Sequence, residues 1–130
     1  MPIKYNIDHE RGLIRTVCSG YVTFAEVLEH FVNLRADASI PDGLDVLLDL
    51  SEVTSVPGTE QLRNVAAETG KLRTIIRWGL LAIVSSQPLL FAMGRMFEAF
   101  AEAYFEEIRV FYRLEDAEAW LGSKHGPATS

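Results

Sequence analysis

The sequence of 130 residues contains a single cysteine, Cys18, so no disulfide bond can form within the chain. A lone thiol fits a reducing compartment, and we expect a cytoplasmic protein. Long apolar runs are also missing, because Arg95, Glu98 and Glu102 interrupt the most apolar stretch before it reaches the roughly eighteen residues that a membrane span needs. The first residues hold no apolar stretch of signal-peptide length. No membrane span is therefore expected.

Basic charge is scarce. The chain has 12 lysine and arginine residues against 18 aspartate and glutamate residues, a net charge of −6, and no two basic residues are adjacent. Nucleic-acid binding needs clustered cations to neutralise phosphates, and anionic membrane surfaces need the same. Both classes of partner are disfavoured.

Groups that could carry catalysis are few and separated. His9 lies beside the first turn, His30 is expected on the polar face of the first helix, and His125 lies near the end of the chain. Each is interpreted as a solvated histidine. No cysteine or histidine spacing suits zinc, no glycine-rich loop could cradle phosphate, and no general acid–base pair can be assembled. We expect a non-catalytic protein without metal or cofactor.

Residues 3–8 alternate between apolar and polar side chains, and together with a second strand expected at residues 13–19 they predict a β-hairpin. Thr23 and Glu26 then have the spacing of a capping box, in which each side chain bonds a free backbone amide of the other. An apolar stripe at helical spacing continues from there to Leu34. The chain thus begins with a hairpin followed by a capped helix.

The near-continuous apolar run at residues 44–50 predicts a strand buried on both faces. A turn at 51–59 follows, and Thr59 is expected to cap a second helix. The remaining pattern predicts a buried strand at 78–84, a helix at 89–106 with Pro88 in its first turn, a strand at 108–112, and a helix at 115–121 that Gly122 ends. We interpret residues 1–122 as a single domain and 123–130 as a disordered tail.

Strands and helices that alternate after a hairpin predict an α/β fold with a mixed five-stranded sheet, ordered β-β-α-β-α-β-α-β-α, whose first strand is antiparallel. In such sheets ligands and partners bind beyond the carboxyl ends of the strands. The candidate site residues are therefore those of the turn after the central strand and those after the next strand, namely Asp49, Ser51, Thr54, Ser55, Gly58, Thr59 and Glu60, with Ser85, Ser86 and Arg95.

Two of these residues allow alternative interpretations. Asp49 interrupts a buried strand, so its carboxylate must be hydrogen-bonded, and we favour a structural acceptor for amides of the turn over a functional group. Arg95 either pairs with Glu98 one turn further on or points into the strand-end crevice and receives an anion. Both alternatives remain open.

The helix at 89–106 is apolar around more than half of its circumference, and Ala92, Ala99 and Ala103 form a flank of small residues. Such a helix needs more cover than one sheet provides. A second subunit or a pocket for an apolar ligand would supply that cover. A homodimer through this helix or a sheet edge is expected.

Several segments resemble the STAS domain, named for sulfate transporters and anti-sigma-factor antagonists, and more closely the SpoIIAA-like group of bacterial proteins with that fold. The matching segments are Gly20-Tyr21-Val22-Thr23, Val46-Leu47-Leu48-Asp49-Leu50-Ser51, Gly94-Arg95-Met96-Phe97-Glu98, Arg109-Val110-Phe111 and Ala117-Glu118-Ala119-Trp120-Leu121. The resemblance implies the same fold and a regulatory role. CRAL-TRIO lipid-binding domains share this general architecture.

In anti-sigma antagonists a serine after the central strand is phosphorylated to release the partner. An ungapped match places that Asp-Ser pair at Pro57 and Gly58, so the switch serine is absent here. Thr59 and Ser55 are the nearest hydroxyls, and helix capping explains Thr59 better than phosphorylation does.

Two functional hypotheses follow. The first is a regulatory or protein-interaction module whose unidentified partner binds the turn at 51–59 and the start of the second helix. The second is a carrier of a small apolar or anionic, lipid-like ligand held beneath the helix at 89–106, with Arg95 as the anion anchor.

Overall fold

The computed structural model describes residues 2–125. The elements in chain order are β1 (Ile3–Asp8), β2 (Leu13–Gly20), α1 (Phe24–Ala36), β3 (Gly43–Val53), α2 (Thr59–Leu72), β4 (Arg77–Val84), α3 (Pro88–Ala101), a 3-10 turn η1 (Glu102–Tyr104), β5 (Glu107–Phe111) and α4 (Leu114–His125).

The five strands form one sheet in the order β1-β2-β3-β4-β5. Strand β1 pairs with β2 in antiparallel fashion, and the pairs β2–β3, β3–β4 and β4–β5 are parallel. This topology confirms the predicted α/β fold, with β3 in the middle. The carboxyl ends of β2 to β5 consequently meet at one edge of the sheet.

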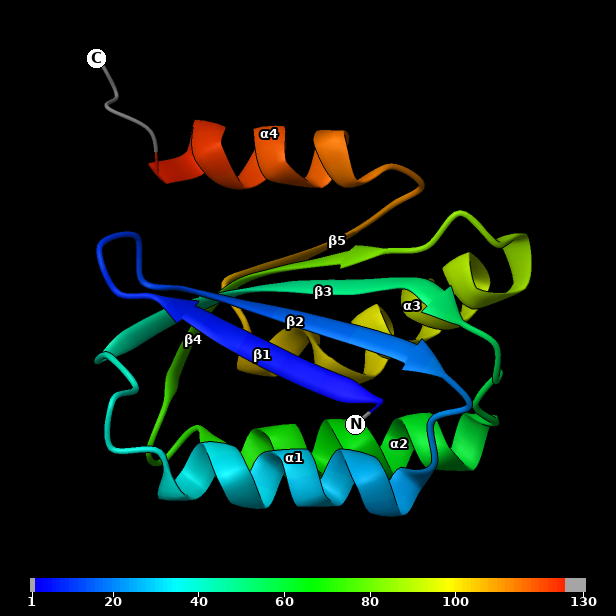
Figure 1. Ribbon diagram of the computed structural model, residues 1–130, viewed down its shortest axis with the longest axis horizontal. Helices are drawn as coiled ribbons and strands as arrows, with labels where there is room; N and C mark the ends of the chain where they lie inside the picture. The colour runs from blue at the N-terminus through cyan, green and yellow to red at the C-terminus, as the bar shows by residue number, and fades with distance from the viewer. Residues whose placement is uncertain (1, 126–130) are drawn as a thin grey trace.

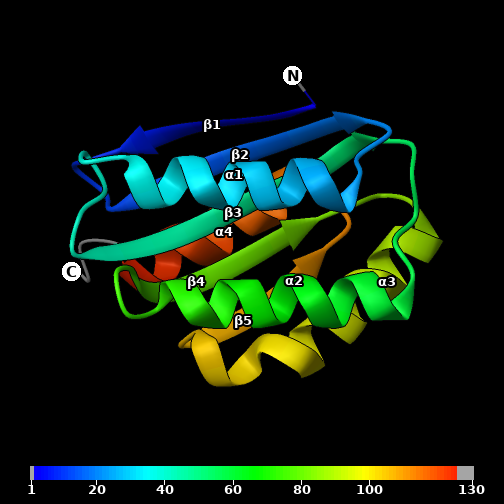
Figure 2. The ribbon, with the colours of Figure 1, turned by 90° about the horizontal axis from the view of Figure 1, so that it is seen from below.

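Helices cover the two faces of the sheet unequally. Helices α1, α2 and α3 pack on one face, and α4 lies on the opposite face (Figures 1 and 2). The α4 face is closed by Leu47 of β3, Leu80 of β4 and Trp120 of α4, among other buried apolar side chains. On the other face the three helices share contacts with β2, β3 and β4.

The predicted helix start at Thr23 is confirmed. Its hydroxyl oxygen accepts a hydrogen bond from the Glu26 amide at 3.2 Å, and the Glu26 carboxylate accepts one from the Thr23 amide at 2.8 Å. The predicted cap at Thr59 is wrong. Gly58 holds the N-cap position and Thr59 is the first residue of α2, where no side chain caps the free amides.

The ends of β3, α3 and α4 also differ from prediction. Strand β3 continues to Val53 because Glu52 and Val53 still pair with Ser19 and Gly20, so Ser51 belongs to the strand and not to the turn. Helix α3 ends at Ala101 instead of 106, because η1 turns the chain and the Glu106 amide bonds the Gly79 carbonyl.

At the other end of the chain, α4 runs through Gly122 to His125, so the predicted stop at Gly122 is wrong. A β-carbon at Gly122 would have no atom within 4 Å, so this glycine lies in open space within the helix. Residues 123–125 of the predicted tail are helical, and 126–130 lie outside the described residues.

Candidate functional site

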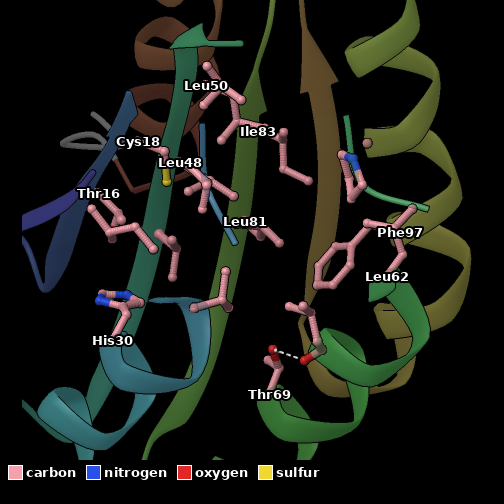
Figure 3. Close-up of a pocket in the computed structure, with 18 of the residues that line it drawn as sticks. Thr16, Cys18, His30, Leu48, Leu50, Leu62, Thr69, Leu81, Ile83 and Phe97 are labelled. Carbon is pink, nitrogen blue, oxygen red and sulfur yellow. Dashed lines mark hydrogen bonds between the residues drawn. The ribbon is translucent and has the colours of Figure 1, made fainter. Parts of the chain in front are cut away.

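The three helices on one face leave a cavity of about 200 Å³ above the middle of the sheet. Apolar side chains from β2, β3 and β4 form its floor, and side chains from α1, α2 and α3 form its walls (Figure 3). Leu48 and Ile83 lie on the floor, and Leu62 and Phe97 belong to the α2 and α3 side. A concave apolar site of this kind is the usual form of a small-molecule site.

The side chains of β3 show that this cavity is accessible. Leu47, which faces α4, is 2% exposed, as expected for the middle strand of a sheet. Val46, Leu48 and Leu50 point to the three-helix face and remain only partly buried. On the three-helix face, the predicted burial of this strand holds at Leu44, which is 1% exposed, and does not hold from Val46 to Leu50.

Polar side chains in the cavity wall fall into two groups. The Ser55 hydroxyl accepts a hydrogen bond from the Val22 amide at 2.9 Å and donates one to the Val22 carbonyl at 3.3 Å. The Thr69 hydroxyl donates to the Val65 carbonyl at 2.9 Å. Within residues 2–125, the side chains of Thr16, Cys18, His30 and Gln61 have no hydrogen-bond partner, although all four line the cavity.

The predicted solvated position of His30 is wrong. Its ring lies in the cavity wall, with its centroid 5.4 Å from that of Tyr5 and 5.8 Å from that of Phe31. Burial lowers the pKa of His30 to about 4, so the imidazole is neutral at physiological pH. At 100° per residue, His30 lies only about 40° around the helix from Leu34. This position at the margin of the apolar stripe is the feature of the sequence that indicates burial of His30.

Two groups near His30 have pKa values shifted upward. Desolvation raises the pKa of the Cys18 thiol to about 11, and Asp49 adds to the effect. The Tyr5 hydroxyl donates to Asp37 at 2.6 Å, and this bond raises the pKa of Tyr5 to about 12. Neither group is ionised near neutral pH. The β2 and α1 side of the cavity is therefore uncharged.

The structure places the first group of predicted site residues along the exit of β3. The Asp49 carboxylate accepts hydrogen bonds from the Ser51 amide at 2.9 Å and the Ser51 hydroxyl at 2.6 Å. This arrangement matches the favoured interpretation of Asp49 as a structural acceptor. The Thr54 amide donates to the Gly20 carbonyl, which ties the turn to the end of β2. Glu60 is exposed in the first turn of α2.

The second group does not converge on the cavity. Ser85 is fully buried, and its hydroxyl accepts from the Gln87 amide at 3.2 Å, whereas Ser86 is exposed. Arg95 Nε lies 3.3 Å from a carboxylate oxygen of Glu98, and the Arg95 side chain is 65% exposed. Of the two alternatives for Arg95, the pairing with Glu98 is observed. Arg95 does not line the cavity, so it is not placed to anchor an anion there.

Among residues 2–125, no group of three histidine, cysteine, aspartate or glutamate side chains could hold a metal ion. In the same part of the chain, no helix is long and apolar enough to cross a membrane. The cavity is thus the feature with the geometry of a binding site.

The fold can now be compared with known proteins. No family model matches the sequence, and no curated protein matches it either. Among solved structures, the chain is similar to an uncharacterized protein of the DUF3478 family from Shewanella loihica PV-4 that has a SpoIIAA-like fold, with 20% sequence identity and a TM-score of 0.60. The similarity covers 92% of this chain and 91% of that chain. This chain has the SpoIIAA-like fold.

Within this SpoIIAA-like fold, the hydroxyls nearest to the switch position have structural contacts. Ser55 joins the turn after β3 to the start of α1 through Val22. The Thr59 hydroxyl lies 3.6 Å from the Met96 sulfur and so links α2 to α3.

The SpoIIAA-like fold also exposes a row of apolar residues beyond the carboxyl ends of its parallel strands. Tyr21 follows β2, Val56 follows β3, Leu89 follows β4 and Tyr112 follows β5, and all four side chains are exposed. Tyr112 stacks on Phe91, with 4.0 Å between ring centroids. We call these four residues the carboxyl-edge row.

Proposed function

We propose that this protein binds a small apolar ligand in the cavity between the sheet and helices α1–α3, and that it does so without catalysis. The observation that carries the proposal is the accessibility of Leu48 and its neighbours on the middle strand, at a place where a sheet covered by helices normally excludes solvent. Apolar cavities of roughly 150 Å³ already bind benzene-sized molecules. A volume of about 200 Å³ suits a small ligand.

Filling the cavity from within tests this proposal. We expect Leu48→Trp to weaken the binding of a neutral fluorescent probe, N-phenyl-1-naphthylamine, by at least about tenfold, because the indole would occupy the space above β3. Val17→Trp is the matched control, since Val17 is an exposed residue on the neighbouring strand and points to the opposite face from Thr16 and Cys18. Fluorescence titration measures both affinities, and thermal melts establish that both variants fold.

Wild-type protein that fails to bind the probe, or a Leu48→Trp variant that binds it as tightly as the wild type, would contradict the proposal. Native mass spectrometry of freshly purified protein adds an independent measurement, because a ligand acquired in the cell is expected to appear as a mass shift that Leu48→Trp reduces.

A second candidate function is that of a protein-interaction module, and the carboxyl-edge row favours it. Exposed apolar residues at one edge of a small domain can mark a contact with another protein. This row includes Val56 of the turn after β3, which is the partner surface that this hypothesis assigns. The same proposal includes a cytoplasmic location and a homodimer formed through α3 or a sheet edge. Ala92 and Ala99 on α3 are exposed, which supports close packing of a second subunit on this helix.

Charge substitution in the carboxyl-edge row tests this second function. We expect Val56→Glu and Leu89→Glu to abolish the retention of partner proteins from a lysate of the source cells, because a carboxylate would be desolvated in the contact. Ile75→Glu is the control, since Ile75 is similarly exposed but follows α2, away from these loops. Partners that stay bound to both row variants would exclude this surface.

A further inference from the structure

On the β2 and α1 side, away from the loops, the cavity wall contains one region of unpartnered polar side chains, and Gln61 supplies another beside the loop after β3. Thr16 on β2 is 3% exposed, yet its hydroxyl has no hydrogen-bond partner within the described residues, and the same holds for the His30 imidazole on α1. Both line the cavity from the β2 and α1 side, across from Leu62 and Phe97 (Figure 3). Neither side chain supplies an enclosed unpartnered atom, so the polar atoms of Thr16 and His30 are open to the cavity and available to a molecule that occupies it.

We propose that Thr16 and His30 are the polar anchor of the cavity, and that they hydrogen-bond the neutral head group of an otherwise apolar ligand, such as an alcohol or a ketone. This inference rests on the proposed ligand-binding function and specifies the chemical class of the ligand.

The other hydroxyls of the wall support this assignment by contrast. Ser55 and Thr69 already exchange hydrogen bonds with backbone groups of their own surroundings. Gln61 lines the cavity from the first turn of α2, beside the loop after β3, whereas Thr16 and His30 lie in the middle of their elements. The free hydrogen-bonding capacity away from the loops is therefore that of Thr16 and His30, with the weak donor Cys18 on the same strand.

The charge of the wall selects a neutral head group. The residues that line the cavity include no lysine, arginine, aspartate or glutamate, and Arg95 lies outside it. A carboxylate buried there would have no counter-ion, and the desolvation penalty of an unpaired buried ion is several kcal/mol or more. Burial keeps His30 neutral, with a pKa of about 4, so the imidazole does not supply the missing positive charge near neutral pH.

The hydrogen-bonding capacity also fits. A neutral imidazole presents one donor and one acceptor, and a threonine hydroxyl presents one donor with two acceptor positions. An alcohol can donate to one of these groups while it accepts from the other. A ketone oxygen can accept from both. An alkane would leave both groups unpaired.

The experiment compares four ligands with the same chain length at pH 7.5: 1-octanol, 2-octanone, octane and octanoate, each as a competitor of N-phenyl-1-naphthylamine. We expect Thr16→Val and His30→Phe each to weaken 1-octanol and 2-octanone by about tenfold, because a buried hydroxyl or carbonyl would lose its partner. The affinity for octane is expected to change by less than about threefold, since an apolar chain makes no such bond. Octanoate is expected to bind the wild type at least about tenfold more weakly than 1-octanol.

Thr69→Val is the matched control, because it removes a hydroxyl from the same cavity that already donates to the Val65 carbonyl. Its affinity for 1-octanol is expected to stay within about twofold of the wild type. Thermal melts establish folding, and Thr16→Val, which conserves side-chain volume, decides the question if His30→Phe fails to fold.

The possible results separate the two proposals. Octane and the probe could bind the wild type while Thr16→Val weakens the affinity for octane and for 1-octanol by the same factor. In that case the proposed anchor is wrong and the ligand-binding function stands. Octanoate that binds as tightly as 1-octanol also overturns the anchor. If neither the probe nor any of the four competitors binds, the ligand-binding function fails together with the anchor.

Discussion

Replacing Trp120 by alanine is expected to lower the free energy of unfolding by about 4 kcal/mol. Trp120 is 7% exposed and belongs to the buried cluster that joins α4 to the sheet, together with Leu47 and Leu80. Its ring centroid lies 5.7 Å from that of Phe111, and the guanidinium carbon of Arg109 lies 5.8 Å from the Trp120 ring. Truncation would leave a large cavity on the face of the sheet that α4 covers.

Urea denaturation followed by circular dichroism measures this loss. The indole nitrogen of Trp120 is buried and has no hydrogen-bond partner in the described part of the chain. The substitution Trp120→Phe therefore removes no hydrogen bond. We expect that control to cost only about 1–2 kcal/mol. Leu114→Ala, at an exposed position of the same helix, is expected to change stability by less than about 0.5 kcal/mol. A Trp120→Ala variant as stable as Leu114→Ala would show that α4 does not pack as described.

Replacing Gly79 by alanine is expected to destabilise the protein by about 3 kcal/mol through overpacking. A β-carbon at Gly79 would collide with the carboxylate of Asp45 on the neighbouring strand. That carboxylate cannot move away without loss, because it accepts a hydrogen bond from the Leu80 amide at 2.8 Å. The contact lies where the pairing of β3 with β4 changes register between Leu44 and Val46.

The same denaturation measurement applies, with Gly122→Ala as the control. Gly122 lies within α4 with open space around its α-carbon, so alanine there is expected to stabilise the protein by about 0.5–1 kcal/mol. A double variant, Gly79→Ala with Asp45→Ala, is expected to cost less than the sum of the single variants, because removing the carboxylate relieves the collision. Strict additivity would argue against the Asp45 contact as the cause.

These two positions lie in the parts of the protein that are closed, and they contrast with the open three-helix face. Leu47 and Trp120 seal one side of β3, whereas Leu48 on the other side of the same strand faces the cavity. A core that only stabilised the fold would have no reason to leave its central strand accessible. We infer that the unequal covering of the sheet is the structural basis of the ligand binding proposed for this protein.

Much of the fold could be predicted because local patterns determine it. The alternation in residues 3–8, the continuous apolar run in β4 and the Thr23–Glu26 capping box each describe neighbours along the chain, and all three are confirmed. The ends of elements were less predictable. Thr59 has the chemistry of a cap, but the chain places Gly58 at that position, and α4 continues past Gly122 to His125.

The candidate site was the least predictable part. Polar groups at strand ends often bind ligands, and this rule predicts the turn residues and Arg95 as the site. In the structure, however, Arg95 pairs with Glu98 on the surface, and the Asp49 carboxylate accepts a hydrogen bond from the Ser51 amide. His30 was assigned to solvent because its neighbours Glu29 and Asn33 are polar. Its actual surroundings come from Tyr5 and from the cavity, which a helical pattern alone does not reveal.

By itself, the sequence determined the order of the elements, the α/β class and the apolar faces, since spacing along the chain decides which side of a strand or helix is apolar. Only the tertiary structure decided that the three helices stand far enough apart to leave a cavity, and that Thr16 and His30 face it without partners. The separation of packed helices depends on how side chains from distant segments fit together, and no local pattern encodes that fit.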